Sequence, residues 1–181
     1  MMQTISPVDG RVYVERATAS TAQIEAALQR ARAAQLQWRA VPVAERARLM
    51  EGFCAAFEAH AAEFAAELSW QMGRPLRYAP NEVRSTLERA RFMIGIAPAA
   101  LADIDVGPKP DFNRFLRREP LGVVFTVAAW NFPYLIAVNS VVPALMAGNV
   151  VLLKHSAQTP LCAERFAECF AAAGLPPGVF Q

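Results

Sequence analysis

The sequence predicts an α/β fold in which N-terminal helices pack on part of a doubly wound parallel sheet. Three helical patterns fill residues 20–97, and two apolar, β-branched runs follow at Gly122–Ala129 and Val150–Leu153. No charged residue lies between Glu119 and Lys154, as expected of a strand–helix–strand unit that is buried on both faces. At 181 residues the chain is long enough to bury a sizeable core in one domain, with or without an appendage.

The N-terminal region is predicted to hold a turn, a strand and a helix. Ser6–Gly10 has the composition of a turn, and a short strand, Arg11–Glu15, follows it. Ser20 or Thr21 can cap a helix that runs to about Trp38. Its inward residues at helical spacing are Ile24, Ala27, Leu28 and Ala31.

Two further helical patterns follow. The first begins near Val43 and runs as one long helix to Gly73–Pro75, where glycine suits a left-handed cap and proline cannot continue a helix. Its apolar stripe is Met50, Phe53, Cys54, Phe57, Ala61, Phe64 and Leu68. The second runs from about Asn81 to Ala97, and Pro98 is expected to end or kink it. Its inward residues are Val83, Leu87, Ala90 and Ile94.

The middle of the chain is predicted to be extended and exposed. Asp105–Pro110 is a linker by composition, and Phe112–Arg118 mixes aromatic and charged residues as an exposed strand does. An exposed edge strand can pair with another chain or another domain.

The last third of the sequence changes to an alternating β and α pattern. The strand Gly122–Ala129 is followed by a helix from about Pro133 to Met146 and by the strand Val150–Leu153. A helix from Pro160 to Ala173 comes next, and a third strand begins after Gly178. This order is typical of a βαβαβ half of a doubly wound sheet with right-handed crossovers.

Composition argues against several classes of protein. The net charge is only +2 and acids and bases are interleaved, so we expect no nucleic-acid partner. No secretory signal pattern opens the chain, and the three cysteines form no CxxC, which together favour a reducing, cytoplasmic setting. The uncharged run 120–153 is longer than a bilayer span, but Asn, Pro and Gly interrupt it, so we expect no membrane segment.

Two polar side chains stand just past the predicted strand ends, where ligands bind in open α/β sheets. Asn131 could donate an amide hydrogen bond to an oxyanion, or it could cap the following helix, and spacing alone favours the cap. Lys154 ends the second strand. It could bond a ribose or a phosphate, or extend to solvent, and the pattern does not separate these two interpretations.

Other candidate residues carry weaker signals. His155 follows the second strand and could touch a ligand, although a loop histidine is the simpler interpretation, and His60 is expected at the surface of a helix. Cys54, Cys162 and Cys169 are expected to be small buried hydrophobic residues rather than nucleophiles. The sequence has no GxGxxG, P-loop or HExxH motif and no carboxylate pair at acid–base spacing.

The order and spacing of several motifs resemble those of the aldehyde dehydrogenase superfamily. The motifs are Pro120–Val124, Trp130–Pro133, Pro143–Asn149, Leu153–Lys154, Gln158–Pro160 and Ala173–Val179, with Ser6–Gly10 and Met72–Pro75 upstream. The resemblance implies a Rossmann-like sheet that lacks GxGxxG. It divides the chain into an N-terminal helical part of the cofactor-binding domain (1–105), a linker and oligomerisation arm (106–120), and the first βαβαβ part of the NAD(P)-binding sheet (121–181).

The resemblance also implies an activity and roles for residues. The family oxidises an aldehyde to a carboxylate with NAD or NADP, through a thiohemiacetal on a cysteine. Asn131 matches the side-chain donor of the oxyanion hole, and Lys154 matches the lysine that bonds the adenosine ribose. Trp130 and Phe132 would line the crevice, with His155 and Ala157 beside the cofactor. The arm would add its edge to a partner subunit in a homodimer or homotetramer.

Two departures from the family pattern carry expectations of their own. Many NAD-preferring members have a glutamate where this chain has Ala157, so we expect easier binding of the 2′-phosphate of NADP. His155 stands where proline is common, so the local loop is expected to differ.

The catalytic domain of the family, with its cysteine nucleophile, glutamate base and second glycine-rich turn, is not in this chain. We therefore expect no aldehyde oxidation by the chain alone. The alternatives are an acyl-CoA-forming member and a non-catalytic fragment that binds nucleotide or mediates oligomerisation.

Overall fold

A computed structural model describes residues 1–181, and its elements follow the predicted change from helices to an α/β unit. In chain order they are β1 (Met2–Ile5), β2 (Val12–Arg16), α1 (Thr21–Trp38), α2 (Val43–Ala59), α3 (Ala61–Met72), α4 (Ala79–Leu101), β3 (Ile104–Asp105), β4 (Phe115–Leu116), β5 (Val123–Val127), α5 (Pro133–Met146), β6 (Val150–Lys154) and α6 (Leu161–Ala172).

The central sheet is parallel, as predicted. β5 and β6 pair in parallel with Val127 opposite Lys154 at their carboxyl ends. The end of the chain adds a third parallel segment, because Phe180 forms a parallel bridge with Val151 on the other side of β6. β6 is therefore the middle strand, and the predicted βαβαβ unit is confirmed.

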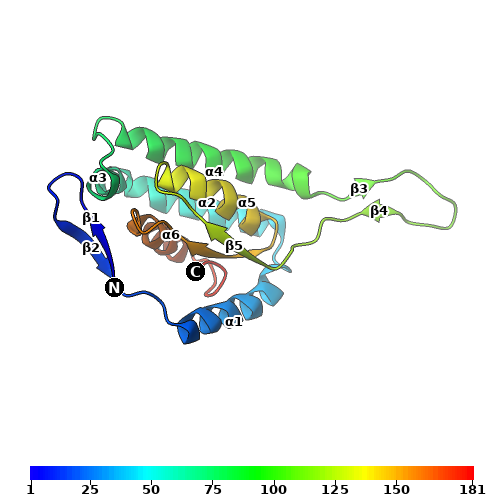
Figure 1. The fold of residues 1–181 in the computed structure, drawn as a ribbon. Coiled ribbons are helices and arrows are strands. Elements are labelled where there is room, and N and C mark those ends of the chain that lie inside the picture. The colour runs from blue at the N-terminus through cyan, green and yellow to red at the C-terminus, as the bar shows by residue number, and fades with distance from the viewer.

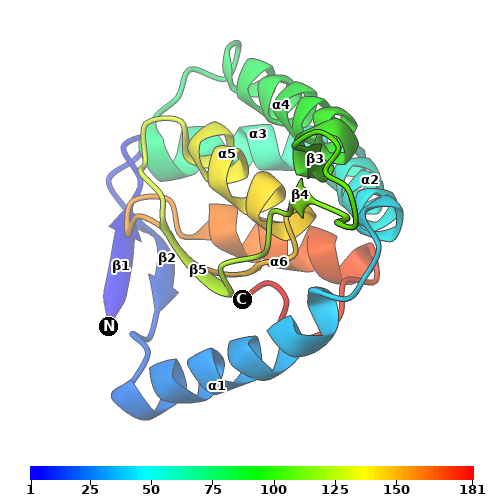
Figure 2. The same ribbon diagram turned by 90° about the vertical axis from the view of Figure 1, so that its right-hand side faces the viewer.

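Helices cover both faces of this sheet (Figures 1 and 2). α5 and α6 lie on one face with α2 and α4 packed behind them, while α1 crosses the other face. The far end of α1 is fixed by Trp38, which is buried and donates its indole N–H to the backbone oxygen of Leu145 at 3.1 Å. This hydrogen bond joins the end of α1 to the C-terminal end of α5.

An aromatic cluster fills the space between α2, α5 and α6. The rings of Phe53 and Phe170 stack with centroids 4.1 Å apart, and Phe57 meets Tyr134 edge to face at 5.0 Å. All four side chains are fully buried. Such pairs add about 0.5–1.5 kcal/mol each to the free energy gained by burying the rings.

The predicted helix boundaries rest on identifiable end signals. Ser20 caps α1 through a capping box in which its hydroxyl accepts from the N–H of Gln23 and the Gln23 side chain accepts from the N–H of Ser20. Gly73 ends α3 with a left-handed φ of 76°. α5 spans Pro133–Met146, in agreement with the prediction.

Several details of the elements differ from the prediction, among them Ile24, which was expected to face inward and is exposed. The long helix from Val43 is broken at His60, which ends α2 and starts α3, although no glycine or proline marks the break. The expected end of the helix at Ala97 was wrong, because α4 continues past Pro98 to Leu101, and a proline in the last turn removes only one hydrogen bond near the end of the helix. The alternative, a kink at Pro98, stays a prediction. β1 was not predicted, since its buried Thr4 is fixed by a distant partner, the backbone oxygen of Ala157.

The exposed segment forms an arm. β3 and β4 pair antiparallel, with Ile104 opposite Leu116, and the hairpin projects away from the body (Figure 1). The arm exposes several large apolar side chains, among them Phe112, Phe115 and Leu116. The strand is shorter than the predicted Phe112–Arg118. None of the helices is long and apolar enough to span a membrane.

Candidate functional site

The candidate site lies where β5 and β6 end side by side. The backbone N–H of Ala128 donates to the oxygen of Lys154 at 3.1 Å, which extends the pairing to the last residue of β6. β5 then leads into the turn Ala129–Phe132, and β6 leads into the loop His155–Thr159. The two predicted polar residues, Asn131 and Lys154, therefore lie in segments that leave the same edge of one sheet.

Asn131 is exposed in the turn before α5, and its side chain forms no hydrogen bond within the chain. The N-cap of α5 is Phe132, without a side-chain cap. The alternative in which Asn131 caps the helix is therefore wrong. Its amide group is left available to a ligand, while its backbone oxygen accepts a 2.7 Å hydrogen bond from Arg74 Nη2.

Lys154 is exposed at the end of β6 and has neither an ion-pair partner nor a side-chain hydrogen bond in the chain. Ala157, three residues further on, is exposed as well. Its backbone is fixed, since its oxygen accepts a 2.8 Å hydrogen bond from the buried Thr4 hydroxyl of β1. The Lys154 ammonium group therefore has no partner within the chain and precedes a loop that is fixed at Ala157. This loop carries no carboxylate at position 157.

His155 is turned into the protein rather than exposed beside Lys154. Its side chain is buried, its Nδ1 accepts from the N–H of Ser156 at 2.9 Å, and its Nε2 lies 3.1 Å from the oxygen of Pro133. Because Nδ1 accepts, the ring carries its proton on Nε2 and donates to Pro133. Burial lowers the pKa of the His155 imidazole and so favours its neutral form. Its role is to join the loop after β6 to the start of α5, and the expectation that it touches a ligand is not supported.

Two exposed aromatic residues flank Asn131. Trp130 and Phe132 are 53% and 46% exposed, which is high for large apolar side chains beside a core. One face of Phe132 is already covered by the Arg74 guanidinium, whose carbon lies 4.5 Å from the ring centroid. The rings can offer apolar surface to a flat ligand group.

A charged pair that no sequence pattern indicated lies behind the turn. Arg74 Nη1 lies 3.0 Å from Glu82 Oε2, and Glu82 Oε1 accepts from the N–H of Tyr134 at 3.1 Å. Burial raises the pKa of the Glu82 carboxyl, while Arg74 and the backbone N–H groups of α5 act to lower it. The sequence indicated Gly73–Pro75 only as the end of a helix. The arginine in this turn, Arg74, was the one sequence feature that could have pointed to the charged pair.

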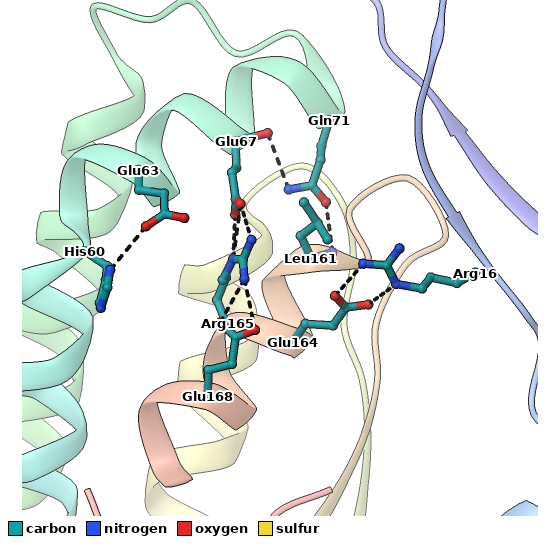
Figure 3. Close-up of polar contacts among 9 residues, drawn as sticks. All are labelled: Arg16, His60, Glu63, Glu67, Gln71, Leu161, Glu164, Arg165 and Glu168. Carbon is teal, nitrogen blue, oxygen red and sulfur yellow. Dashed lines mark hydrogen bonds and ion pairs between the residues drawn. The ribbon is translucent and has the colours of Figure 1, made fainter. Parts of the chain in front are cut away.

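Gln71 of α3 holds the end of the loop after β6, and Figure 3 shows its contact with Leu161, the first residue of α6. Gln71 accepts from the backbone N–H of Leu161 at 3.0 Å with its side chain, and its backbone oxygen accepts from Gln158 Nε2 at 2.7 Å. One turn away, Arg165 of α6 is paired with Glu67 of α3. These contacts fix the loop that follows Lys154.

The three cysteines are buried, as predicted. Burial raises the pKa of the Cys54 and Cys169 thiols to about 12 and that of Cys162 well above its usual value. Thiolates are the nucleophilic form, so none of these thiols is suited to attack a substrate. The site within this chain consists of a hydrogen-bond donor, a cation and two aromatic surfaces.

Comparison with known proteins gives one consistent result. A profile described as the aldehyde dehydrogenase family matches residues 1–181. The chain is 36% identical over 183 residues to succinate-semialdehyde dehydrogenase [NADP(+)] 1 of Mycobacterium bovis, covering 98% of this chain and 39% of that protein. It is also 36% identical over 180 residues to N-succinylglutamate 5-semialdehyde dehydrogenase of Ectopseudomonas mendocina, covering 99% and 37%.

A solved structure agrees with the sequence matches. The crystal structure of PnpE in complex with nicotinamide adenine dinucleotide superposes with a TM-score of 0.92 at 31% identity, covering 99% of this chain and 37% of that one. The chain thus spans about two fifths of the length of the proteins that it matches.

Proposed function

Because the chain belongs to the aldehyde dehydrogenase family, we propose that it is the N-terminal part of an enzyme that oxidises an aldehyde with NAD or NADP. The observation that carries the proposal is the shared strand edge, where Val127 pairs with Lys154 and both strands lead into the site. In this edge the Asn131 amide and the Lys154 ammonium are without partners inside the chain.

The residues present fit a dinucleotide. Lys154 would donate hydrogen bonds to the hydroxyls of the adenosine ribose, and Trp130 and Phe132 would cover apolar parts of the ligand. Ala157 places no carboxylate near the ribose, so a 2′-phosphate meets no like charge and NADP is accepted. The name of the mycobacterial relative includes NADP, and the similar structure of PnpE was solved in complex with NAD. Both support the proposal that the cofactor is NAD or NADP. When bound, the nicotinamide supplies the hydride acceptor.

Asn131 would act on the substrate. When a nucleophile adds to the aldehyde, the carbonyl oxygen gains negative charge, and an amide N–H held beside it stabilises that charge. Removing one such donor costs about 10²–10³-fold in kcat in other enzymes. The nucleophile must come from outside this chain, because its own thiols are buried and protonated. The chain alone is therefore proposed to be inactive.

The arm β3–β4 is proposed to assemble the enzyme as a homodimer or homotetramer. Its two short strands expose apolar side chains and unpaired backbone groups, which suit addition to the edge of a partner sheet.

The chain provides matched controls for an experimental test. It has only two lysines, Lys154 and Lys109, and the second lies on the arm. In the parent protein that carries this region, we expect Lys154→Ala to weaken NADP binding by about tenfold or more, as loss of a charged hydrogen bond does. Lys109→Ala should leave binding unchanged.

For catalysis, Asn131→Ala should lower kcat by about 10²–10³-fold, and Asn139→Ala, an exposed position on α5, should not. The assay is formation of reduced cofactor with succinate semialdehyde and N-succinylglutamate 5-semialdehyde as first substrates, with and without coenzyme A. A parent protein without cofactor-dependent aldehyde oxidation would refute the proposal, and a requirement for coenzyme A would assign the acyl-CoA-forming reaction.

A further inference from the structure

A charged pair behind the candidate site lies almost entirely out of solvent. Arg74 follows the glycine that ends α3, and Glu82 lies in the first turn of α4. The Arg74 Nη1 to Glu82 Oε2 distance is 3.0 Å, with side-chain exposures of 12% and 0%. The contact is close, although Glu82 Oε2 is not aligned for a hydrogen bond. Burying two charges is costly, so such a pair is weak evidence of a purely stabilising role.

Both members of the pair also hold the turn that carries Asn131. Arg74 Nη2 donates to the backbone oxygen of Asn131 at 2.7 Å, and its guanidinium covers one face of Phe132. Glu82 Oε1 accepts from the N–H of Tyr134 at 3.1 Å. Two residues of the turn, Asn131 and Phe132, and the second residue of α5, Tyr134, are thus held by two side chains from another part of the chain.

The one other side-chain hydrogen bond to the backbone of residues 129–134 comes from His155, whose Nε2 lies 3.1 Å from the oxygen of Pro133. The N-cap of α5, Phe132, provides no side-chain hydrogen bond, so Glu82 supplies the acceptor that a capping residue normally provides. The Asn131 side chain has no partner within the chain, so its position follows from the backbone that carries it. Rotation of the Asn131 peptide would move the amide away from a bound carbonyl.

We propose that Arg74 and Glu82 are positioning residues for catalysis: they fix the backbone of the Asn131 turn so that the Asn131 amide meets the developing oxyanion. The inference rests on the proposed function. In this role Arg74 acts through the turn that carries Asn131 and Phe132, and not by contact with the substrate. A displacement of about 1 Å in a catalytic group can cost up to about 10²-fold in rate.

A double-mutant cycle in the parent protein tests the inference. We expect Arg74→Met to lower kcat by about 10- to 10²-fold while the KM for NADP changes by less than about twofold, because Lys154 is untouched. In an Asn131→Ala background the same substitution should add almost no further loss. Arg74→Lys should recover only part of kcat, because one ammonium cannot bond Asn131, pair with Glu82 and cover Phe132 together.

Two further variants separate positioning from folding. Arg74→Met leaves the Glu82 carboxylate buried without its partner, so that variant is also expected to be less stable. Combining it with Glu82→Gln removes the stranded charge and should recover thermal stability, while kcat stays low. Arg84→Gln, an exposed arginine on α4, is the matched control and should leave kcat and stability unchanged.

The outcomes are distinct. If Arg74→Met lowers kcat by the same factor with and without Asn131, or only in proportion to the unfolded fraction, the positioning role is refuted while the proposed function stands. If the parent protein oxidises no aldehyde, or Asn131→Ala leaves kcat unchanged, the proposed function fails and the inference fails with it.

Discussion

Loss of the Arg165 guanidinium should destabilise the chain far more than loss of the carboxylate of its exposed partner, Glu168. Arg165 Nε lies 2.9 Å from Glu67 Oε2, and Nη1 lies 2.8 Å from Glu168 Oε2 (Figure 3). The Glu67 side chain is 9% exposed, against 58% for that of Glu168. Arg165→Met keeps the aliphatic stem but leaves the Glu67 carboxylate buried and unpaired.

The expected magnitude follows from this burial. Removing one partner of a buried ion pair lowers the free energy of unfolding by about 3–5 kcal/mol. For Arg165→Met we expect a loss of about 3 kcal/mol, because the Arg165 side chain is itself one-fifth exposed. Glu168→Gln removes an exposed contact and should cost less than about 1 kcal/mol. Arg165→Met combined with Glu67→Met removes both charges and should recover most of the loss.

Urea unfolding of the purified chain measures these differences in the free energy of unfolding. One probe is tryptophan fluorescence, to which the buried Trp38 contributes with Trp70 and Trp130, and circular dichroism is another. If the two probes give the same unfolding transition, the free energies of unfolding of the variants can be compared with a two-state model. An Arg165→Met variant within about 1 kcal/mol of the wild type, or a Glu168→Gln variant that loses as much as Arg165→Met, would refute the reasoning.

Three further predictions test the frame of the site. Gly148→Ala should lower the free energy of unfolding by about 1–3 kcal/mol, since φ is 84° and the new Cβ would lie 2.5 Å from Arg46 Nη1. Gly10→Ala, with φ 76° and no atom within 4 Å of the new Cβ, should lower it by less in the same urea assay. Burial lowers the folded-state pKa of His155, so the unfolded chain binds the extra proton first and stability should fall as pH drops below about 6.5. The His155→Asn variant should lose less between pH 7 and pH 5, and equal losses in the two proteins would contradict the account. Ala157→Glu should weaken NADP binding to the parent protein by about tenfold with little effect on NAD, and equal effects on both dissociation constants would count against a ribose at this loop.

Much of the α/β unit could be predicted because its signals are local. Proline opens α5, and Gly148, in the left-handed conformation, follows its end. The apolar sequences of β5 and β6, on either side of α5 in the chain, indicate buried strands without any knowledge of the rest of the fold. Placing Asn131 and Lys154 at one edge needed only the rule that parallel strands end together.

The parts that could not be predicted depend on distant partners. The break at His60 has no local signal, and β1 depends on a contact between Thr4 and Ala157. Spacing gave no sign that Arg74 and Glu82 converge on one turn. His155 was placed beside the cofactor by its position after Lys154, but its hydrogen bonds draw the ring inward.

The division of the chain at residues 105 and 120 stays a prediction. The arm β3–β4 does project from the body, which is consistent with a separate role, but it is the assembled enzyme that would show what the arm contacts.

The claim on which the account depends is that the edge at Lys154 holds the nucleotide, and lysine labelling tests it directly. The parent protein is treated with a lysine-selective acylating reagent with and without NADP, and peptide mass spectrometry follows Lys154 and Lys109 separately. Bound NADP should slow modification of Lys154 by about tenfold and leave modification of Lys109 unchanged. Equal labelling of Lys154 at saturating NADP would contradict it.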